Sequence, residues 1–375
     1  MQINFLGDLV APSVEDIILS SDIKEILSHG DINILNCEAA AIDVDNGRYK
    51  KILKSGPNIY QSKDVPEWLY KEGFTVVSLA NNHIYDYGEN AIEDTIGSFT
   101  NVKTFGAGNW DEAYKPFVTS VCGKSVAILA LTHCEFGTLI DRWDKRLKQG
   151  AAWINHPCVD NIIHSIREKV DYLFVFAHAG VEHLNQPLPE WRDRYRSFID
   201  MGCDGVIASH PHIIQGWEKY KGKPIVYSLG NFYFPLSKEM PRSWYKSIIA
   251  SLLIDEEGNI DVKVTPLMYS LGAINVDKTE EASLYLKNVN DTLLDEDKYI
   301  KFIDKAALER MEMFYTMFQN GGMARCYTFK KIIRVIISYI QGKIHYNPSW
   351  LYNNIQSESH RWLFLRGFKN INNLK

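Results

Sequence analysis

The sequence has 375 residues, of which 46% are hydrophobic and 23% are charged, and its formal net charge is −5. This composition is typical of a globular protein and gives no electrostatic reason to expect a nucleic-acid partner. No apolar run reaches about 18 residues, so the sequence predicts no transmembrane helix. The first residues carry no basic segment followed by an apolar one, so no signal peptide is predicted. We therefore expect a cytoplasmic protein whose six cysteines are reduced thiols.

Short apolar runs early in the chain each end in polar side chains. Residues 2–6, 32–35 and 76–80 predict buried strands, and the stretches between them have helical spacing or loop composition. Alternating strands and helices are typical of an α/β sheet, which places its active site at the carboxyl ends of the strands. The side chains at these strand ends belong to Asp8, Glu38, Asn81, Asn82 and His83.

The same pattern returns in the second half of the chain. Residues 172–176, 206–208 and 225–229 predict three more buried strands. Residues 117–121 and 125–131 predict a hairpin, and residues 135–157 have no clear period, which suggests a loop or lid near the site. The polar residues after the later strands are His178, Glu182, His210, His212 and Asn231.

Each of these residues has an ordinary structural explanation when it is considered alone. Asp8 and Asn82 could cap helices, Glu38 could be a solvated loop residue, and His178 could be a hydrogen-bonded core histidine. What favours a metal site is their convergence on one sheet edge. Imidazole, carboxylate and amide oxygen ligands suit two divalent cations of the Mn, Fe or Zn type, and the lack of thiolates argues against a structural zinc site.

The character of the chain changes near residue 280. Residues 281–320 predict helices, and residues 321–375 contain basic residues with Glu358 as their one acid. We predict a domain over residues 1–275 and a helical, basic extension over residues 276–375. Residues 329–337 have apolar side chains at helical intervals beside basic ones, which is typical of a helix packed on the core or on a second subunit. The other interpretation is peripheral contact with an anionic membrane, at its inner face.

Longer blocks of sequence surround the candidate ligands, namely GD (7–8), NCE (36–38), SLANNHIYDYG (78–88), GAGNWDEAYKP (106–116), HAGVE (178–182) and SHPHIIQGWEKYKGKPIVYSLGNFYF (209–234). Together they resemble the CapA family of bacterial capsule-synthesis, poly-γ-glutamate-associated proteins. This family belongs to the calcineurin-like metallophosphoesterases. The resemblance covers about residues 1–270. It implies a four-layer α-β-β-α sandwich with a two-metal site at the sheet edge, and a role in making capsule or exopolysaccharide.

The resemblance also implies roles for individual residues. Two ions would be held as follows: Asp8 and His212 on the first, Glu38 bridging the pair, and Asn82, His178 and His210 on the second. His83 would be the catalytic residue that protonates the leaving oxygen. Further positions, for substrate or for support of the ligands, would be taken by Asn81, Asp86, Glu182 and Asn231. The chain departs from classical metallophosphoesterases at Val10, where they carry a histidine, so one ion has fewer protein ligands.

Three functions follow from this pattern. The first is a metal-dependent phosphatase or phosphodiesterase acting on a phosphorylated or polymeric capsule precursor. The second is a non-hydrolytic component of a capsule or poly-γ-glutamate assembly or export complex. The third is an amide-bond enzyme acting on that polymer, because the same ions polarise a carbonyl as well as a phosphoryl group.

Overall fold

The computed structural model describes residues 1–15, 17–143, 147–270, 272–319, 333, 336, 337, 340, 341 and 348–372, without the side chains of 312–319. The chain forms two compact units. The first comprises Met1–Ile52 and Asn58–Glu296, and the second comprises Leu53–Pro57 and Asp297–Lys375. The boundary that we predicted at residue 275 stays a prediction.

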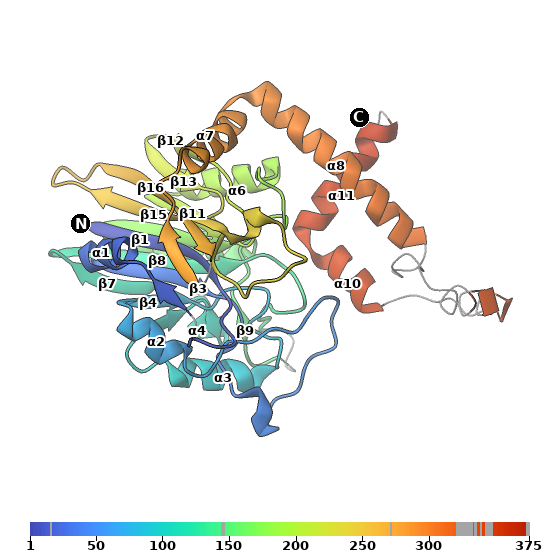
Figure 1. Ribbon diagram of the computed structural model, residues 1–375, viewed down its shortest axis with the longest axis horizontal. Coiled ribbons are helices and arrows are strands. Elements are labelled where there is room, and N and C mark those ends of the chain that lie inside the picture. Colours follow the sequence, from blue (N-terminus) through green and yellow to red (C-terminus); the bar gives the residue numbers. More distant parts are fainter. Residues whose placement is uncertain are drawn as a thin grey trace. The chain divides into compact units, whose positions relative to one another are not determined.

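A nine-stranded sheet forms one half of the first unit (Figure 1). Strands β1, β3, β4 and β5, which lie next to one another up to the β5 edge, run parallel, as the early strand–helix alternation predicts. Strands β15 and β16 form an antiparallel hairpin beside β1. In spatial order the strands are β2 (Ile18–Leu19), β17 (Ala273–Val276), β16 (Ile260–Ser270), β15 (Lys246–Ile254), β1 (Gln2–Leu9), β3 (Ile32–Cys37), β4 (Val76–Ser78) and β5 (Lys103–Phe105), with β14 (Asn231–Tyr233) also paired to β1.

A six-stranded sheet forms the other half. Strands β8, β10, β11 and β13 are parallel, and β7 and β12 are antiparallel edge strands. The order is β12 (Trp217–Tyr220), β13 (Lys223–Val226), β11 (Gly205–Ser209), β10 (Tyr172–His178), β8 (Lys124–Thr132) and β7 (Phe117–Val121). A separate small ribbon pairs β6 (Ala107–Gly108) with β9 (Gly150–Ala151).

The two sheets pack face to face through a buried apolar layer. Phe5 of β1 and Phe176 of β10 meet edge to face, with ring centroids 5.3 Å apart. Ile34 and Val76 from the first sheet and Ile207 from the second join the same cluster. Each fully buried side chain of this kind contributes on the order of 1.5–3 kcal/mol through removal from water. This layer fixes the two sheets against each other.

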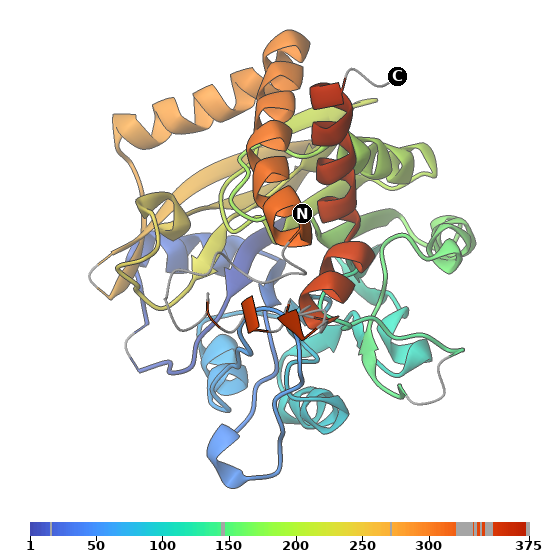
Figure 2. The same cartoon turned by 90° about the vertical axis from the view of Figure 1, so that its right-hand side faces the viewer.

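Helices cover both outer faces (Figure 2). On the nine-stranded sheet lie α1 (Ser21–His29), α2 (Val65–Lys71) and α3 (Glu89–Ser98), whose apolar residues share one core with the sheet. On the six-stranded sheet, α6 (Pro189–Asp200) contacts β11 and β13, and α5 (Pro157–Arg167) is tied to the loop before β11 through Arg167 and Asp204, 2.6 Å apart. The expected four-layer α-β-β-α sandwich is therefore confirmed. The other helical elements of this unit are α4 (Trp110–Ala113), α7 (Glu280–Leu294), η1 (Val44–Asn46) and η2 (Arg242–Tyr245).

Apart from Leu53–Pro57, the described part of the second unit is largely helical, which confirms the helical C-terminal region. Its helices are α8 (Glu296–Gln319), α10 (Pro348–Gln356) and α11 (Glu358–Asn372). A Cβ at Gly367 of α11 would lie 2.5 Å from the carbonyl oxygen of Ala307, so these two helices approach closely at a glycine. No described helix combines the length and the apolar character needed to cross a bilayer. The predicted basic segment 329–337 lies largely outside the described residues, and its membrane contact stays a prediction.

Candidate metal centre

Both sheets deliver polar side chains to one place. The parallel strands β1, β3 and β4 of one sheet and β8, β10 and β11 of the other end there. The side chains at or just after these ends are buried almost completely: Asp8, Asn36, Glu38, Asn81, Asn82, His83, His133, Glu135, His178, His210 and His212. The structure thus brings together all of the metal ligands that we predicted from the sequence.

The Gly7-Asp8 pair is required by a close approach between strands. The amide of Asp8 donates to the carbonyl oxygen of Gly230 at 3.1 Å, as β1 pairs with β14. A Cβ at Gly7 would lie only 1.8 Å from that same oxygen. No side chain can be accommodated at position 7 unless β14 moves, so glycine allows Asp8 to reach its place.

The first group of candidate ligands consists of Asp8, Glu38 and His212. One ligand atom from each lies within 4.8 Å of the others. His212 Nδ1 is 3.7 Å from Asp8 Oδ2, and His212 Nε2 is 3.8 Å from Glu38 Oε1. This arrangement agrees with the predicted first ion, for which Asp8, Glu38 and His212 were the expected protein ligands.

His178 lies at the centre of the second predicted set. Its Nε2 atom is 3.0 Å from Asn82 Oδ1, 3.2 Å from His210 Nδ1 and 3.7 Å from Glu38 Oε1. Its Nδ1 atom faces Asp8 Oδ1 at 3.4 Å. The Asn82 amide oxygen, the His210 imidazole and the Glu38 carboxylate thus all lie within 4 Å of His178 Nε2, and Glu38 Oε1 also lies near His212 of the first group. The second ion at this place stays a prediction.

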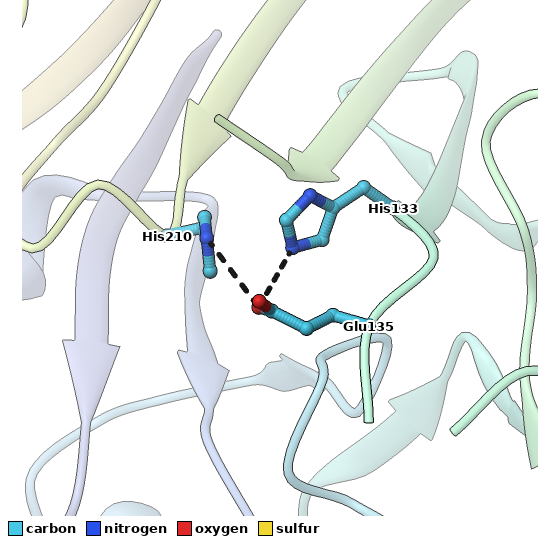
Figure 3. Close-up of side chains that lie close together, drawn as sticks. All are labelled: His133, Glu135 and His210. Atoms are coloured by element: carbon cyan, nitrogen blue, oxygen red, sulfur yellow. Dashed lines mark ion pairs between the residues drawn. The ribbon is translucent and has the colours of Figure 1, made fainter. Parts of the chain in front are cut away.

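Two residues that the sequence argument missed, His133 and Glu135, complete a further cluster (Figure 3). Oε2 of Glu135 is 3.3 Å from His133 Nε2 and 3.9 Å from His210 Nε2. The three residues form a second group whose ligand atoms lie within 4.8 Å of one another. His133 directly follows β8 and Glu135 comes two residues later, so the strand-end signal used elsewhere in the chain also marks this segment.

Several polar residues around the ligands hold them in place. His83 Nδ1 and Asp86 Oδ2 are 2.8 Å apart, and His212 Nδ1 lies 2.9 Å from Asn231 Oδ1. Asn81 donates to the carbonyl oxygen of Cys37 at 2.9 Å, which ties the Asn-Asn-His segment to the end of β3. Asn81, Asp86 and Asn231 thus lie beside the candidate ligands or His83, and the supporting roles predicted for them stay predictions.

Asn36 and Glu182 differ from the prediction in opposite ways. Asn36 was not a candidate, yet its Nδ2 atom donates to Asp8 Oδ1 at 2.7 Å and lies 3.0 Å from His178 Nδ1. Glu182 lies in the loop after β10, is half-buried, and is in neither group of candidate ligands. Its predicted contribution stays a prediction.

The His210-Pro211-His212 segment has an unusual backbone. His210 has a φ of 99° and His212 a φ of 59°, in the region that favours glycine. Such a conformation costs on the order of 1–3 kcal/mol per residue and persists only where surrounding contacts enforce it. Here the amide of His210 donates to Asp8 Oδ2 at 3.0 Å. The strain therefore occurs where two imidazoles are turned toward the carboxylates.

The protonation states suit a bound cation. Burial by itself raises the pKa of Asp8, but the nearby His178 and His212 imidazoles outweigh it and lower this pKa to about 2. Burial, together with the neighbouring imidazoles, lowers the pKa of His210 well below its usual value. Burial also lowers the pKa of His178, despite the opposing effect of Asp8. At neutral pH the site therefore holds an ionised carboxylate and imidazoles with lone pairs available.

The donor set fits divalent metal ions. Asp8, Glu38 and Glu135 supply three carboxylates within a buried cluster of imidazoles, and neither group of candidate ligands contains a thiolate. Buried carboxylates at such density are costly unless positive charge compensates them. Nitrogen and oxygen ligands of this kind are those of catalytic Mn, Fe or Zn centres.

Fold and site together define an α/β protein of four layers with a candidate metal centre where the two sheets meet. The chain matches the model of the family described as "Bacterial capsule synthesis protein PGA_cap" over residues 11–236, more than half of its length. The chain belongs to this family. The match begins just after Asp8 and includes every other predicted metal ligand.

Two curated relatives come from Bacillus. The chain is 27% identical over 293 residues to the capsule biosynthesis protein CapA of Bacillus anthracis, covering 71% of this chain and 68% of that protein. It is 30% identical over 222 residues to the PGA biosynthesis protein CapA of Bacillus subtilis, covering 56% of this chain and 55% of that protein. The chain thus spans about half to two thirds of the length of these relatives.

Among solved structures, the chain is similar to the 5′-nucleotidase of Candida albicans. The TM-score is 0.42 at 10% identity, over 81% of this chain and 57% of that one. This similarity is too distant to bear on the activity.

Proposed function

We propose that this chain is a metal-dependent phosphoester hydrolase, a phosphatase or phosphodiesterase, that acts in capsule or exopolysaccharide synthesis. One observation carries the proposal. The first group, Asp8, Glu38 and His212, lies directly beside the cluster around His178, and Glu38 Oε1 is within 4 Å of nitrogens from both. Two adjacent cation positions that share a carboxylate are the arrangement used for phosphoester hydrolysis.

The ligands divide between the two positions as follows. Asp8 and His212 would hold the first ion, Glu38 would bridge, and Asn82, His178 and His210 would hold the second. When bound, such ions lower the pKa of a water molecule toward neutrality and neutralise charge on the phosphoryl oxygens. The neutral state of the His178 and His210 imidazoles keeps these ligands ready to bind at neutral pH.

His83 is the proposed proton donor to the leaving oxygen. Its Nδ1 atom is 2.8 Å from Asp86 Oδ2, and Asp86 Oδ2 also accepts from the amide of Ile59 at 2.8 Å. A carboxylate that is fixed in this way orients the imidazole ring. The proton would therefore pass from Nε2 of His83, the ring nitrogen that Asp86 does not hold.

The test combines metal content with turnover. Protein purified without added metal is analysed for Mn, Fe and Zn, and hydrolysis of bis(p-nitrophenyl) phosphate is followed before and after Mn²⁺ is restored. We expect about two equivalents of metal and metal-dependent turnover in the wild type. His178→Ala, which removes a ligand of the second ion, should lower the metal content and abolish turnover. His164→Ala, which removes an exposed imidazole on α5, is the matched control. Wild-type protein with neither metal nor turnover would favour a non-hydrolytic role in an assembly or export complex.

A second candidate substrate is the amide bond of a poly-γ-glutamate polymer. What favours it is the relative from Bacillus subtilis, which is a PGA biosynthesis protein. The same residues would serve, because bound ions polarise a carbonyl group in the way they polarise a phosphoryl group. Incubation of metal-loaded protein with poly-γ-glutamate separates the two. Release of glutamate or short peptides, without cleavage of the phosphodiester, would replace the first candidate by the second.

A further inference from the structure

Among the buried carboxylates of the site, Glu135 has no role in the proposed function. It follows β8, from the sheet opposite to the one that carries Asp8 and Glu38, and is 3% exposed. Its Oε2 atom accepts a hydrogen bond from Asn82 Nδ2 at 2.9 Å. The same oxygen faces His133 Nε2 and His210 Nε2 (Figure 3). Glu135 thus contacts two proposed ligands of the second ion.

The contact with Asn82 decides which way its amide is turned. The oxygen and the NH₂ group of an asparagine side chain are nearly equal in size, but only the oxygen is suited to bind a cation. A carboxylate can only accept hydrogen bonds, so Glu135 holds the NH₂ group on its own side. Asn82 Oδ1 then lies on the opposite side, 3.0 Å from His178 Nε2, among the proposed ligands.

The two ring nitrogens of His210 also face different sides, like the oxygen and the NH₂ group of Asn82. Its Nδ1 atom is 3.2 Å from His178 Nε2, whereas its Nε2 atom is on the side of Glu135, 3.9 Å from Oε2. Imidazoles that bind metals commonly turn their other nitrogen toward a carboxylate, which fixes the ring and raises its basicity. His133 packs beside this pair: its ring centroid is 4.2 Å from that of His210, and its backbone amide donates to the carbonyl oxygen of His178 at 3.1 Å.

We infer that Glu135 is a positioning residue for the second ion: it orients the amide of Asn82 and faces the outer nitrogen of His210, and it does not itself bind an ion. This inference rests on the proposed function, since it assumes that the site holds two ions. The His133–Glu135–His210 group is then a support for the metal centre and not a third cation position.

The experiment is a titration of apo protein with Mn²⁺, read by calorimetry and by metal analysis at saturation, and it needs no turnover. For Glu135→Gln we expect two ions at saturation, as in the wild type, with the affinity for one of them reduced about 10- to 100-fold. Glu135→Asp, which keeps the charge and the acceptor, should recover part of this loss. Glu218→Gln is the matched control, because Glu218 is another buried carboxylate, bound to Arg196 on α6 and outside this site.

A second variant tests the orientation of the amide directly. In Asn82→Asp both outer atoms are oxygens, so no flip remains to be fixed, and Glu135 instead repels the new carboxylate. Adding Glu135→Gln to Asn82→Asp should therefore raise the affinity for Mn²⁺ above that of Asn82→Asp alone. A further loss of affinity in the double variant would overturn the inference.

Other outcomes are separable. Loss of one ion at saturation in Glu135→Gln would show that Glu135 is a ligand. Unchanged affinities for both ions would show that Glu135 does not support metal binding. Either result overturns the inference while the proposed function stands. Wild-type protein that binds no metal would overturn both.

Discussion

His212 and Asn231 form a directed pair: His212 Nδ1 lies 2.9 Å from Asn231 Oδ1, and Asn231 Nδ2 donates to the carbonyl oxygen of Trp244 at 3.0 Å. The second contact fixes the amide, so its oxygen accepts a hydrogen bond from the protonated Nδ1 of His212. This leaves the lone pair of His212 on Nε2, the nitrogen on the side of Glu38.

Replacement of Asn231 should therefore weaken the binding of the first ion. We expect Asn231→Ala to lower the affinity for Mn²⁺ at one position about 10- to 100-fold, because the tautomer and orientation of His212 are no longer fixed. Asn231→Asp keeps an acceptor and should retain most of the affinity. Calorimetric titration of apo protein measures both. Equal affinities for Asn231→Ala and the wild type would contradict this assignment.

Substitution of His83 should separate turnover from metal binding. We expect His83→Gln to lower kcat for bis(p-nitrophenyl) phosphate about 10²- to 10⁴-fold, the usual contribution of a general acid, with two metal equivalents retained. Asp86→Asn leaves the imidazole in place and should cost less. Steady-state kinetics with parallel metal analysis checks this. Loss of metal in His83→Gln would instead give His83 a part in holding an ion.

Removal of metal should lower thermal stability. Ions that bind only the folded chain stabilise it by about 2.7 kcal/mol per site at a free concentration of 100 times Kd. We expect a chelator to lower Tm by several degrees and Mn²⁺ to restore it, with a smaller shift in Asp8→Ala, which lacks a ligand of the first ion. Differential scanning calorimetry with and without chelator measures the effect. A chelator-induced shift of wild-type size in Asp8→Ala would place the stabilising ion elsewhere.

Gly7→Ala should be strongly destabilising. The added Cβ would lie 1.8 Å from the carbonyl oxygen of Gly230, so β14 must move, at a cost of about 3 kcal/mol or more. Gly97→Ala is the control, since a Cβ there meets no atom within 4 Å on α3, and it should raise the free energy of unfolding by about 0.5–1 kcal/mol. Urea unfolding of both variants gives the comparison. A Gly7→Ala protein as stable as the wild type would disprove the close approach.

The stability of α6 on its sheet should depend on pH through Glu218. Burial by itself raises the pKa of Glu218, but hydrogen bonds from Arg196 and Tyr227 and the charge of Arg192 outweigh it, so this pKa is lowered. A carboxyl with a lowered folded pKa stabilises the protein above its unfolded pKa, near 4.5, and this contribution is lost as the pH falls through the folded value.

Glu218→Gln should consequently unfold more easily than the wild type at neutral pH, by about 1.5–3 kcal/mol. The difference should shrink as the pH falls below about 4.5. Urea unfolding between pH 7 and the lowest pH at which both proteins fold gives the two curves. A difference that is constant with pH would exclude the charge as its cause.

The sequence was sufficient for the architecture because buried parallel strands and their polar ends are local patterns. Apolar runs before Asp8, Glu38 and His178 predicted that these side chains would meet, and they do. Pairing between strands that are far apart in the sequence is not a local pattern, and the sequence did not predict it. Residues 125–131 were paired only with 117–121. In the structure β8 reaches Thr132 and also pairs in parallel with β10, where Thr132 aligns with His178.

That pairing is what brings His133 and Glu135 to the site. Both belong to a run without a helical or strand period, in or beside the segment predicted as a loop or lid. The contact of Asn36 with Asp8 and His178 was not predicted for another reason. It depends on which way an amide turns among Asp8 and His178, and that orientation is set by neighbours far away in the sequence. Sequence patterns give the strand ends but not the hydrogen-bond partners between them.

The division of the metal centre between two sheets has a consequence during synthesis. Asp8 leaves the ribosome early, but its partner His210 follows 202 residues later, and Asn231 later still. A nascent or truncated chain that lacks the later strands carries carboxylates without their imidazoles and has no complete centre. The proposed ions can therefore be held only after the strands that carry both sets of ligands have been made and the two sheets have joined.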